Sequence, residues 1–251
     1  MKKGLYLIMK TSDFSRVYIF IFVFIFGILA VSAQKAVKTN VMIVPEKPVI
    51  VIDAGHGGED GGTQSADGVL EKDINLAISL KLKKILDSYG FTTVMIRDSD
   101  KMIYDSSAST VRNKKSSDLH NRMDIMKKYP GSIFLSIHQN HFSESKYSGA
   151  QVFYCKKQIG SAELAECIQK CIVSALQNDN TRQVKPCTSS VYLIYNAATT
   201  AVMVECGFMS NKAEAEKLSD DAYQYELALA ISKGLMNYLY QKDADNYGSK
   251  N

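Results

Sequence analysis

The sequence has few cysteines and lacks the cysteine spacings of a zinc ribbon or a disulfide-rich module. Its five cysteines include no CxxC pair, and their odd number leaves at least one thiol unpaired within the chain. They are Cys155, Cys167, Cys171, Cys187 and Cys206. Cys167 and Cys171 continue an apolar helical stripe, which favours small buried side chains over a bridge or a metal site. We therefore expect no catalytic role for the cysteines.

The body of the chain also lacks a concentrated positive charge. The formal net charge is +4, and Lys2, Lys3, Lys10 and Arg16, against Asp13, place most of it before residue 34. Proteins that bind nucleic acids need a basic face that neutralises phosphates. Because no run of lysine and arginine interrupts the remaining sequence, we set nucleic acid aside as a partner.

Nucleotide-binding motifs are absent as well. A glycine-rich turn follows Asp53, but no Lys-Ser/Thr pair comes after its glycines, and the GxGxxG spacing is missing. The chain also holds no internal repeat. The glycines are therefore better explained by close backbone approach in a ligand pocket than by a phosphate loop.

An apolar run near the N-terminus predicts export. The run extends from Val17 to Val31 behind a basic segment, and Val31-Ser32-Ala33 offers the small residues that a signal peptidase accepts. Residues 1–33 are therefore predicted to be a signal peptide or, if uncleaved, a signal anchor that attaches the protein to the membrane. We expect the folded part of the protein to lie outside the cytoplasmic membrane.

The remaining sequence is predicted to hold one folded domain. Residues 34–47 have scattered polar residues and no period, which is typical of a linker, and Pro45 and Pro48 bracket the entry to the domain. The domain is expected over residues 48–241, and residues 242–251 are polar enough to form a fraying tail.

Apolar strands and amphipathic helices alternate through this domain. Helices are expected at 74–86, with Gly90 terminating the first one, then up to residue 129, at 164–172 and at 227–235, and a polar loop is expected at 98–117. Strands are expected at 49–52, 91–96, 133–137, 150–154, 191–194 and 201–204. This alternation predicts an α/β fold of the phosphorylase/hydrolase kind, a mostly parallel twisted sheet of about six strands with helices on both faces.

Reactive side chains follow the ends of the predicted strands, where parallel sheets form their sites. His56 and His138 stand at two such ends, and Glu71 opens the first helix. A His/Glu/His set is the ligand type of hydrolytic zinc sites. Taken singly, each has a structural explanation: a turn histidine, a core histidine hydrogen-bonded to backbone, and a first-turn acid that complements the helix dipole.

Glu205 directly follows the apolar strand 201–204, where a carboxylate is costly to bury unless it is paired, bound to metal or functional. The residues alone do not decide which of the two glutamates does which task. His120 and His141 are expected to be surface residues or to support the site from behind.

The motifs around these residues resemble the zinc N-acetylmuramoyl-L-alanine amidases of the large cell-wall hydrolase family. The resemblance covers about residues 48–240 and lies in VIDAGHGGEDGG, GVLEKDINL, SIHQN and VMVECGFMSN. Within that family, DLHNRMDI and TRQVKPCTSSVYLI are similar to the germination-specific amidases of spore-forming bacteria.

The resemblance implies a role for individual residues. It implies that His56, Glu71 and His138 hold one Zn²⁺ per chain and that Glu205 is the catalytic carboxylate. Asn140 matches a strand-end asparagine that shapes the substrate site. Arg122 matches a helical arginine of unassigned role. Ala54 replaces the usual proline before the glycine-histidine pair, which is expected to loosen that loop.

The resemblance also implies a substrate and a cellular place. The expected reaction is hydrolysis of the amide between the lactyl group of N-acetylmuramic acid and L-alanine of the stem peptide in peptidoglycan. In spore formers this leads to muramic lactam in the cortex and to germination, which places the protein in the cell wall or the spore intermembrane space. The loop 98–117 is too short and too polar to plug the site, so we expect an open groove. No wall-binding repeat is present, so localisation is expected to come either from the leader or from an accessory protein partner.

Two other functions remain compatible with the residues alone. A zinc peptidase on a related fold would use the same metal chemistry on bonds between amino acids. A non-catalytic wall-binding module would have kept the fold without the chemistry, although neither Glu205 nor a zinc ligand is lost.

Overall fold

The computed structural model describes residues 47–248. The predicted leader (1–33) and almost all of the predicted linker lie outside the described residues. The elements are β1 (Ile50–Ala54), α2 (Glu71–Ser88), β2 (Thr93–Met95), α3 (Val111–Lys127), β3 (Ile133–Asn140), β4 (Gln151–Tyr154), α4 (Ser161–Leu176), β5 (Lys185–Pro186), α5 (Tyr192–Tyr195), β6 (Thr200–Phe208), α6 (Lys212–Ser219) and α7 (Asp221–Gly248). None of the described helices is long and apolar enough to cross a membrane.

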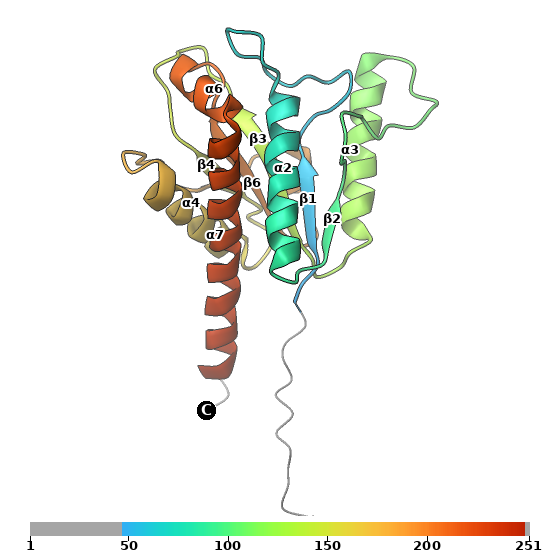
Figure 1. Cartoon of the computed structure of the whole chain (residues 1–251). Helices are drawn as coiled ribbons and strands as arrows, with labels where there is room; N and C mark the ends of the chain where they lie inside the picture. Colours follow the sequence, from blue (N-terminus) through green and yellow to red (C-terminus); the bar gives the residue numbers. More distant parts are fainter. Residues whose placement is uncertain (1–46, 249–251) are drawn as a thin grey trace, which may run out of the picture. The chain divides into compact units, whose positions relative to one another are not determined.

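The strands form one six-stranded sheet in the order β2-β1-β3-β6-β4-β5. Strands β2, β1, β3 and β6 are parallel to one another, whereas β4 runs antiparallel to β6 and β5 pairs with β4 in parallel. The carboxyl ends of β1, β3 and β6 therefore meet at one edge of the sheet (Figure 1). The predicted α/β fold with a mostly parallel sheet of six strands is confirmed.

Both faces of the sheet are covered because its central strands are apolar on both sides. Ile50 and Ile52 pack into one core cluster with residues of α2, α4 and α7. Val51, between them, points to a second cluster with residues of α3 and α5, as the alternation of side chains along a strand requires. Figure 1 shows α2 and α7 side by side over one face, and α3 on the side of the sheet where β2 is the edge strand.

Helix α2 carries Glu71, one of the three predicted metal ligands, at its N-terminus. It begins at Glu71, after a loop that returns from β1, and its buried side chains repeat at the spacing of one helix face. The helix ends before Gly90, whose φ of 75° lies in the left-handed region that glycine adopts without strain. The predicted helix and its terminating glycine are both found.

The structure corrects several element boundaries. The apolar run 191–194 was predicted to be a strand, but it lies largely in the one-turn helix α5, where Leu193 and Ile194 are buried. A short apolar run can be buried in either conformation, so periodicity does not distinguish them. The sixth strand is instead β5, whose two residues, Lys185 and Pro186, are exposed and carry no apolar signal.

The predicted loop 98–117 is also too long, because α3 begins at Val111. The Thr110 side chain caps this helix by accepting a hydrogen bond from the Asn113 N–H. The first turns of α3 are polar because they face solvent, which removes the periodic signal. Strand β2 is shorter than the predicted 91–96, and α7 continues past Gln241 into the predicted polar tail.

The cysteines are buried, as the apolar helical stripe around Cys167 and Cys171 predicts. All five are free and buried, and none contributes a ligand atom to the cluster of His56, Glu71 and His138 described below. They fill space in the core as small apolar side chains.

Candidate metal centre

The loop after β1 holds His56 in an unusual backbone conformation. Its φ is 61°, which is uncommon for a residue other than glycine and typical of strained functional positions. The surrounding contacts hold it there: Arg122 Nη2 donates to the His56 carbonyl at 2.6 Å. Gly57 and Asp60 exchange backbone hydrogen bonds immediately after it. The loop is therefore built to direct one imidazole.

Three predicted ligand residues converge at this edge of the sheet. Glu71 Oε1 lies 3.3 Å from His56 Nε2 and 3.0 Å from His138 Nδ1. The two imidazole rings stand nearly perpendicular with their centroids 5.0 Å apart. Each residue offers a ligand atom, and these atoms all lie within 4.8 Å of one another. The predicted His/Glu/His set thus forms one cluster, from the loop after β1, the start of α2 and β3.

Glu71 is fixed by its neighbours as well as by the histidines. Its Oε2 accepts from the Thr63 N–H at 2.9 Å, and its Oε1 accepts from the Gln139 N–H at 3.0 Å and from Asn75 Nδ2 at 3.2 Å. Burial would raise the pKa of Glu71, but the hydrogen bonds to His138 and His56 outweigh burial and lower that pKa. Glu71 is therefore a carboxylate at neutral pH, which is the form that binds a metal.

A second carboxylate orients His56. Asp60 Oδ2 lies 2.9 Å from His56 Nδ1, so the imidazole is held from behind while Nε2 faces Glu71. Burial would lower the pKa of His56, but the hydrogen bonds to Asp60 and Glu71 raise it to about 9. A carboxylate behind a metal-binding histidine is a common means of fixing its tautomer and orientation.

Two glycines of the predicted motif make room for this cluster. A Cβ atom on Gly55 would collide with the His138 imidazole. A Cβ on Gly62, whose φ is +69°, would stand 2.6 Å from Glu71 Oε2 and 2.7 Å from His56 Cδ2. The glycine-rich turn therefore serves close packing around the site, as its composition suggested.

Glu205 stands beside the cluster on β6. The parallel register of β3 and β6 places it opposite His138, so its side chain lies on the same face of the sheet. Its Oε2 is buried, and among the described residues it has no hydrogen-bond partner. Burial raises the pKa of Glu205 to about 7. A buried carboxylate of this kind is suited to take up and release a proton near neutral pH.

Arg122, whose role the sequence left unassigned, is the buried anchor of the His56 loop. From α3 it donates to Asp53 Oδ1 at 2.6 Å, to Asp118 Oδ2 at 2.6 Å and to the carbonyls of Ala54 and His56. Arg97 also donates to the carbonyls of Ala54 and Gly55. Both arginines thus donate hydrogen bonds to the carbonyl of Ala54. These bonds hold the backbone at the residue that was expected to loosen this loop.

We expect the ion pair of Arg122 and Asp53 to contribute to the free energy of unfolding by an amount that depends on pH. Both side chains are almost fully buried, and removing one partner of a buried pair costs about 3–5 kcal/mol. Burial would raise the pKa of Asp53, but Arg122 lowers it on balance. A carboxyl with a depressed pKa stabilises the fold above its unfolded pKa of about 4 and loses that contribution as the pH falls through its folded pKa.

Arg122→Met should therefore lower the free energy of unfolding at pH 7, and the difference from wild type should shrink as the pH falls below about 4. Denaturant unfolding at several pH values measures this. Arg112→Met, which changes an exposed arginine at the start of the same helix, is the control and should stay within about 0.5 kcal/mol of wild type. An equal loss in the Arg122 variant at pH 7 and pH 3 would contradict the assignment.

The remaining predicted residues lie outside the cluster. Asn140 ends β3, its carbonyl accepts from the Met209 N–H, and it pairs in register with Phe208. His120 lies on α3, where its Nδ1 contacts the Ser116 carbonyl and its ring lies against Tyr192. His141 is exposed. Neither His120 nor His141 belongs to the cluster of ligand atoms.

Sequence reasoning missed the residues that support the site. Asp60 lies in the VIDAGHGGEDGG motif, and its position four residues after His56 could have indicated a contact between the two side chains. Asn75 lies one turn after Glu71 on the same helix face, which was also readable. Arg97 carried no such signal, because all its partners are backbone carbonyls, and three of them, those of Ala54, Gly55 and Lys72, are distant in the sequence.

The donor set fits a zinc ion. Two ligand atoms about 2.1 Å from a tetrahedral zinc ion stand about 3.4 Å apart, close to the separations of Glu71 Oε1 from His56 and His138. Two imidazoles and one carboxylate leave a fourth position open, with the unpaired Glu205 oxygen nearby. This fold and this arrangement are typical of metal-dependent hydrolases.

The chain belongs to the N-acetylmuramoyl-L-alanine amidase family, whose sequence model matches residues 50–237. The germination-specific N-acetylmuramoyl-L-alanine amidase of Bacillus subtilis is 32% identical over 194 residues, which cover 77% of this chain and 81% of that protein. The protein is therefore an N-acetylmuramoyl-L-alanine amidase, a hydrolase that acts on peptidoglycan.

Solved structures agree with this assignment. The CwlD amidase from Clostridioides difficile, solved in complex with the GerS lipoprotein, matches with a TM-score of 0.75 and 40% identity over 77% of this chain and 99% of that chain. The amidase AmiC2 of Nostoc punctiforme matches with a TM-score of 0.67 and 27% identity over 78% of this chain and 98% of that chain. The peptidase and the non-catalytic module are thus set aside in favour of the amidase.

Proposed function

We propose that the amidase reaction is zinc-dependent and takes place at the cluster of His56, Glu71 and His138, with Glu205 as the catalytic carboxylate. The observation that carries the proposal is the buried, unpaired Oε2 of Glu205 beside three converging ligand residues. A buried polar atom without a partner is costly. Its retention here is explained if the oxygen serves the reaction.

The residues of the chain then divide the work. When bound, zinc supplies Lewis acidity that activates a water molecule and polarises the lactyl carbonyl. Glu205 accepts the proton of the attacking water and gives it to the nitrogen of the leaving L-alanine. Asp60 and Asn75 hold His56 and Glu71 in place, and Arg122 fixes the loop that carries His56. Asn140, at the end of β3, contributes to the substrate site.

We further propose that the enzyme matures the spore cortex, where removal of stem peptides leads to muramic lactam and prepares germination. Two relatives support this: the Bacillus subtilis protein is germination-specific, and the Clostridioides difficile amidase was solved with a lipoprotein partner. The proposal includes an accessory protein for this chain as well. It also includes export through residues 1–33, as a cleaved signal peptide or an anchor, followed by the linker 34–47 and the catalytic domain 48–241.

Analysis of reaction products tests the proposed function. Purified protein with Zn²⁺ is expected to release intact stem peptides from peptidoglycan and to leave a free lactyl carboxylate on muramic acid, as read by mass spectrometry. Chelation should abolish the release, and added Zn²⁺ should restore it. Full activity in the chelated sample would overturn the zinc dependence. Cortex peptidoglycan that resists the enzyme while vegetative peptidoglycan is cleaved would overturn the cortex role.

A further inference from the structure

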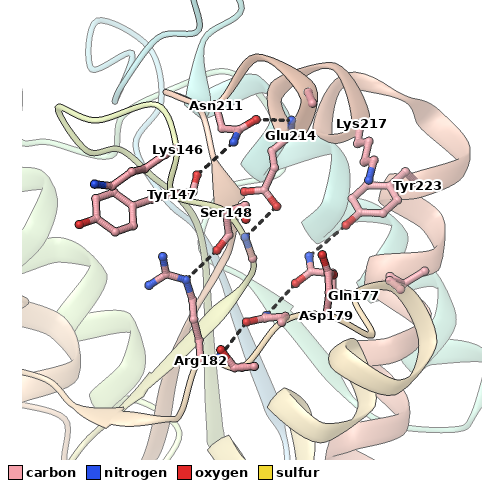
Figure 2. Close-up of a pocket in the computed structure, with 15 residues that line it drawn as sticks. Lys146, Tyr147, Ser148, Gln177, Asp179, Arg182, Asn211, Glu214, Lys217 and Tyr223 are labelled. Carbon is pink, nitrogen blue, oxygen red and sulfur yellow. Dashed lines mark hydrogen bonds between the residues drawn. The ribbon is translucent and has the colours of Figure 1, made fainter.

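A second hollow lies at the same edge of the sheet as the metal centre. It has a volume of about 560 Å³ and is bounded by the segment 146–149, the end of α4, the segment 179–182 and the start of α6. Figure 2 shows its lining residues, among them Tyr147, Glu214 and Arg182. None of the residues proposed above for catalysis lines this hollow. Its function is therefore separate from the proton transfer and metal binding proposed above.

Arg182 is held rigidly at the rim of this hollow. Its Nε donates to the Ser148 carbonyl at 2.7 Å, and its backbone N–H donates to Asn180 Oδ1 at 2.9 Å. The guanidinium lies over the Phe208 ring, 4.6 Å from the centroid, and 5.8 Å from the centroid of the Tyr147 ring. Stacking on aromatic rings and one fixed hydrogen bond leave the guanidinium little freedom.

The outer end of this guanidinium is available to a ligand. Within residues 47–248, no hydrogen bond or ion pair engages its two terminal nitrogens, which Figure 2 shows beyond the Nε bond to Ser148. Burial raises the pKa of Glu214 on balance, although the charge of Arg182 acts to lower that pKa. The two carboxylate oxygens of Glu214 already accept hydrogen bonds from the N–H groups of Gly149 and Phe208. Arg182 thus presents a preorganised fork, which matches a carboxylate through two parallel hydrogen bonds.

The register of the sheet relates Arg182 to the metal centre. The pairing of β3 and β6 shifts between His138 and Asn140, so that Phe208 stands opposite Asn140. Phe208 follows Glu205 by three residues, which is at most about 10 Å along a strand, and at this shift the three residues oppose only two steps of β3. Since Arg182 stacks on Phe208, its guanidinium lies at a distance from Glu205 that a few residues of extended peptide span.

The substrate supplies an anion on one side of the scissile bond. The amino sugars of peptidoglycan are uncharged where the lactyl group is amidated, whereas the peptide bears carboxylates. We propose that Arg182 binds a carboxylate of the stem peptide, the leaving group, and makes the enzyme selective for peptides in which that carboxylate is free. This inference rests on the proposed function, because it needs the scissile amide beside Glu205.

Paired substrates test the inference. Two glycan-linked stem peptides are compared, identical except that the peptide carboxylates are free in one and amidated in the other. Wild type is expected to favour the free form in kcat/KM by about ten- to a hundredfold, the worth of a hydrogen bond to a charged group. Arg182→Gln should lose that preference by slowing the free form alone, mainly through KM. Arg182→Lys, which keeps the charge and loses the fork, should fall between them.

The outcomes separate this inference from the proposed function. Arg112→Gln, an exposed change on α3, is the control and should keep the wild-type preference. Equal slowing of both substrates by Arg182→Gln would show that Arg182 only holds the segment 180–184, which overturns the inference. No preference in wild type would overturn it too, while cleavage of both substrates leaves the proposed function standing. Failure of wild type to cleave either one would overturn both.

Discussion

Glu205→Gln is expected to lower kcat by about 10²–10⁴-fold, the usual contribution of a general acid–base group. Glutamine has nearly the same volume, but its amide cannot accept the proton of the attacking water. The variant should bind zinc as wild type does, because Glu205 is outside the ligand cluster. It should unfold at the same temperature or a higher one, since a buried carboxylate without a partner on Oε2 is removed. Product release by mass spectrometry, zinc content and thermal unfolding are measured together.

Glu216→Gln provides the matched control for Glu205. Glu216 is an exposed carboxylate on α6, and its replacement should leave kcat, zinc content and unfolding temperature unchanged. If Glu205→Gln keeps more than about a tenth of wild-type kcat, Glu205 is not the proton carrier. If it loses activity together with its zinc, the residue acts through the metal instead.

The loss expected from Glu71→Gln is of a different kind. Zinc affinity should fall by more than about 100-fold, which is the upper range for a residue that merely supports a ligand, and activity should disappear with the metal. The cause is geometric: both oxygens of Glu71 accept hydrogen bonds, from Thr63 on one side and from Gln139 on the other. An amide nitrogen at either place would meet an N–H donor. Metal content after dialysis and competition with a chelator measure the loss.

Asp73→Asn serves as the control for Glu71. Asp73 lies in the first turn of the same helix and is exposed, so its replacement changes the helix dipole interaction without touching the cluster. It should retain one zinc ion per chain and full activity. A Glu71→Gln variant that also retains one zinc ion after dialysis would rule out Glu71 as a ligand.

The supporting residues of the site differ in how far sequence could reveal them. Asp60 and Asn75 stand four residues from His56 and Glu71, a spacing that local geometry can relate to its partner. Arg97 and Arg122 bind carbonyl groups of a loop that is distant along the chain. Every residue has a carbonyl, so no pattern of side chains could have indicated these contacts.

Local chemistry in the sequence determined most of the elements. The continuous apolar run at 49–52 can be satisfied only between two covered faces, so it predicted a buried central strand. The periodic apolar residues of 74–86 and the glycine at 90 predicted one helix and its end. Where that signal was absent, as in the polar turns of α3, or ambiguous, as at 191–194, prediction failed. Each of these properties depends on neighbours within a few positions, which the sequence displays directly.

Tertiary structure alone decided which of these elements are neighbours. The strand order places β1 beside β3 and β3 beside β6, and this adjacency brings His56, His138 and Glu205 to one edge although they are far apart in sequence. The same pairing sets Phe208, over which the Arg182 guanidinium lies, opposite Asn140. Strand pairing depends on the packing of the whole core rather than on local periodicity. For that reason the sequence could name candidate residues for the site of this amidase, and only the fold could bring them together.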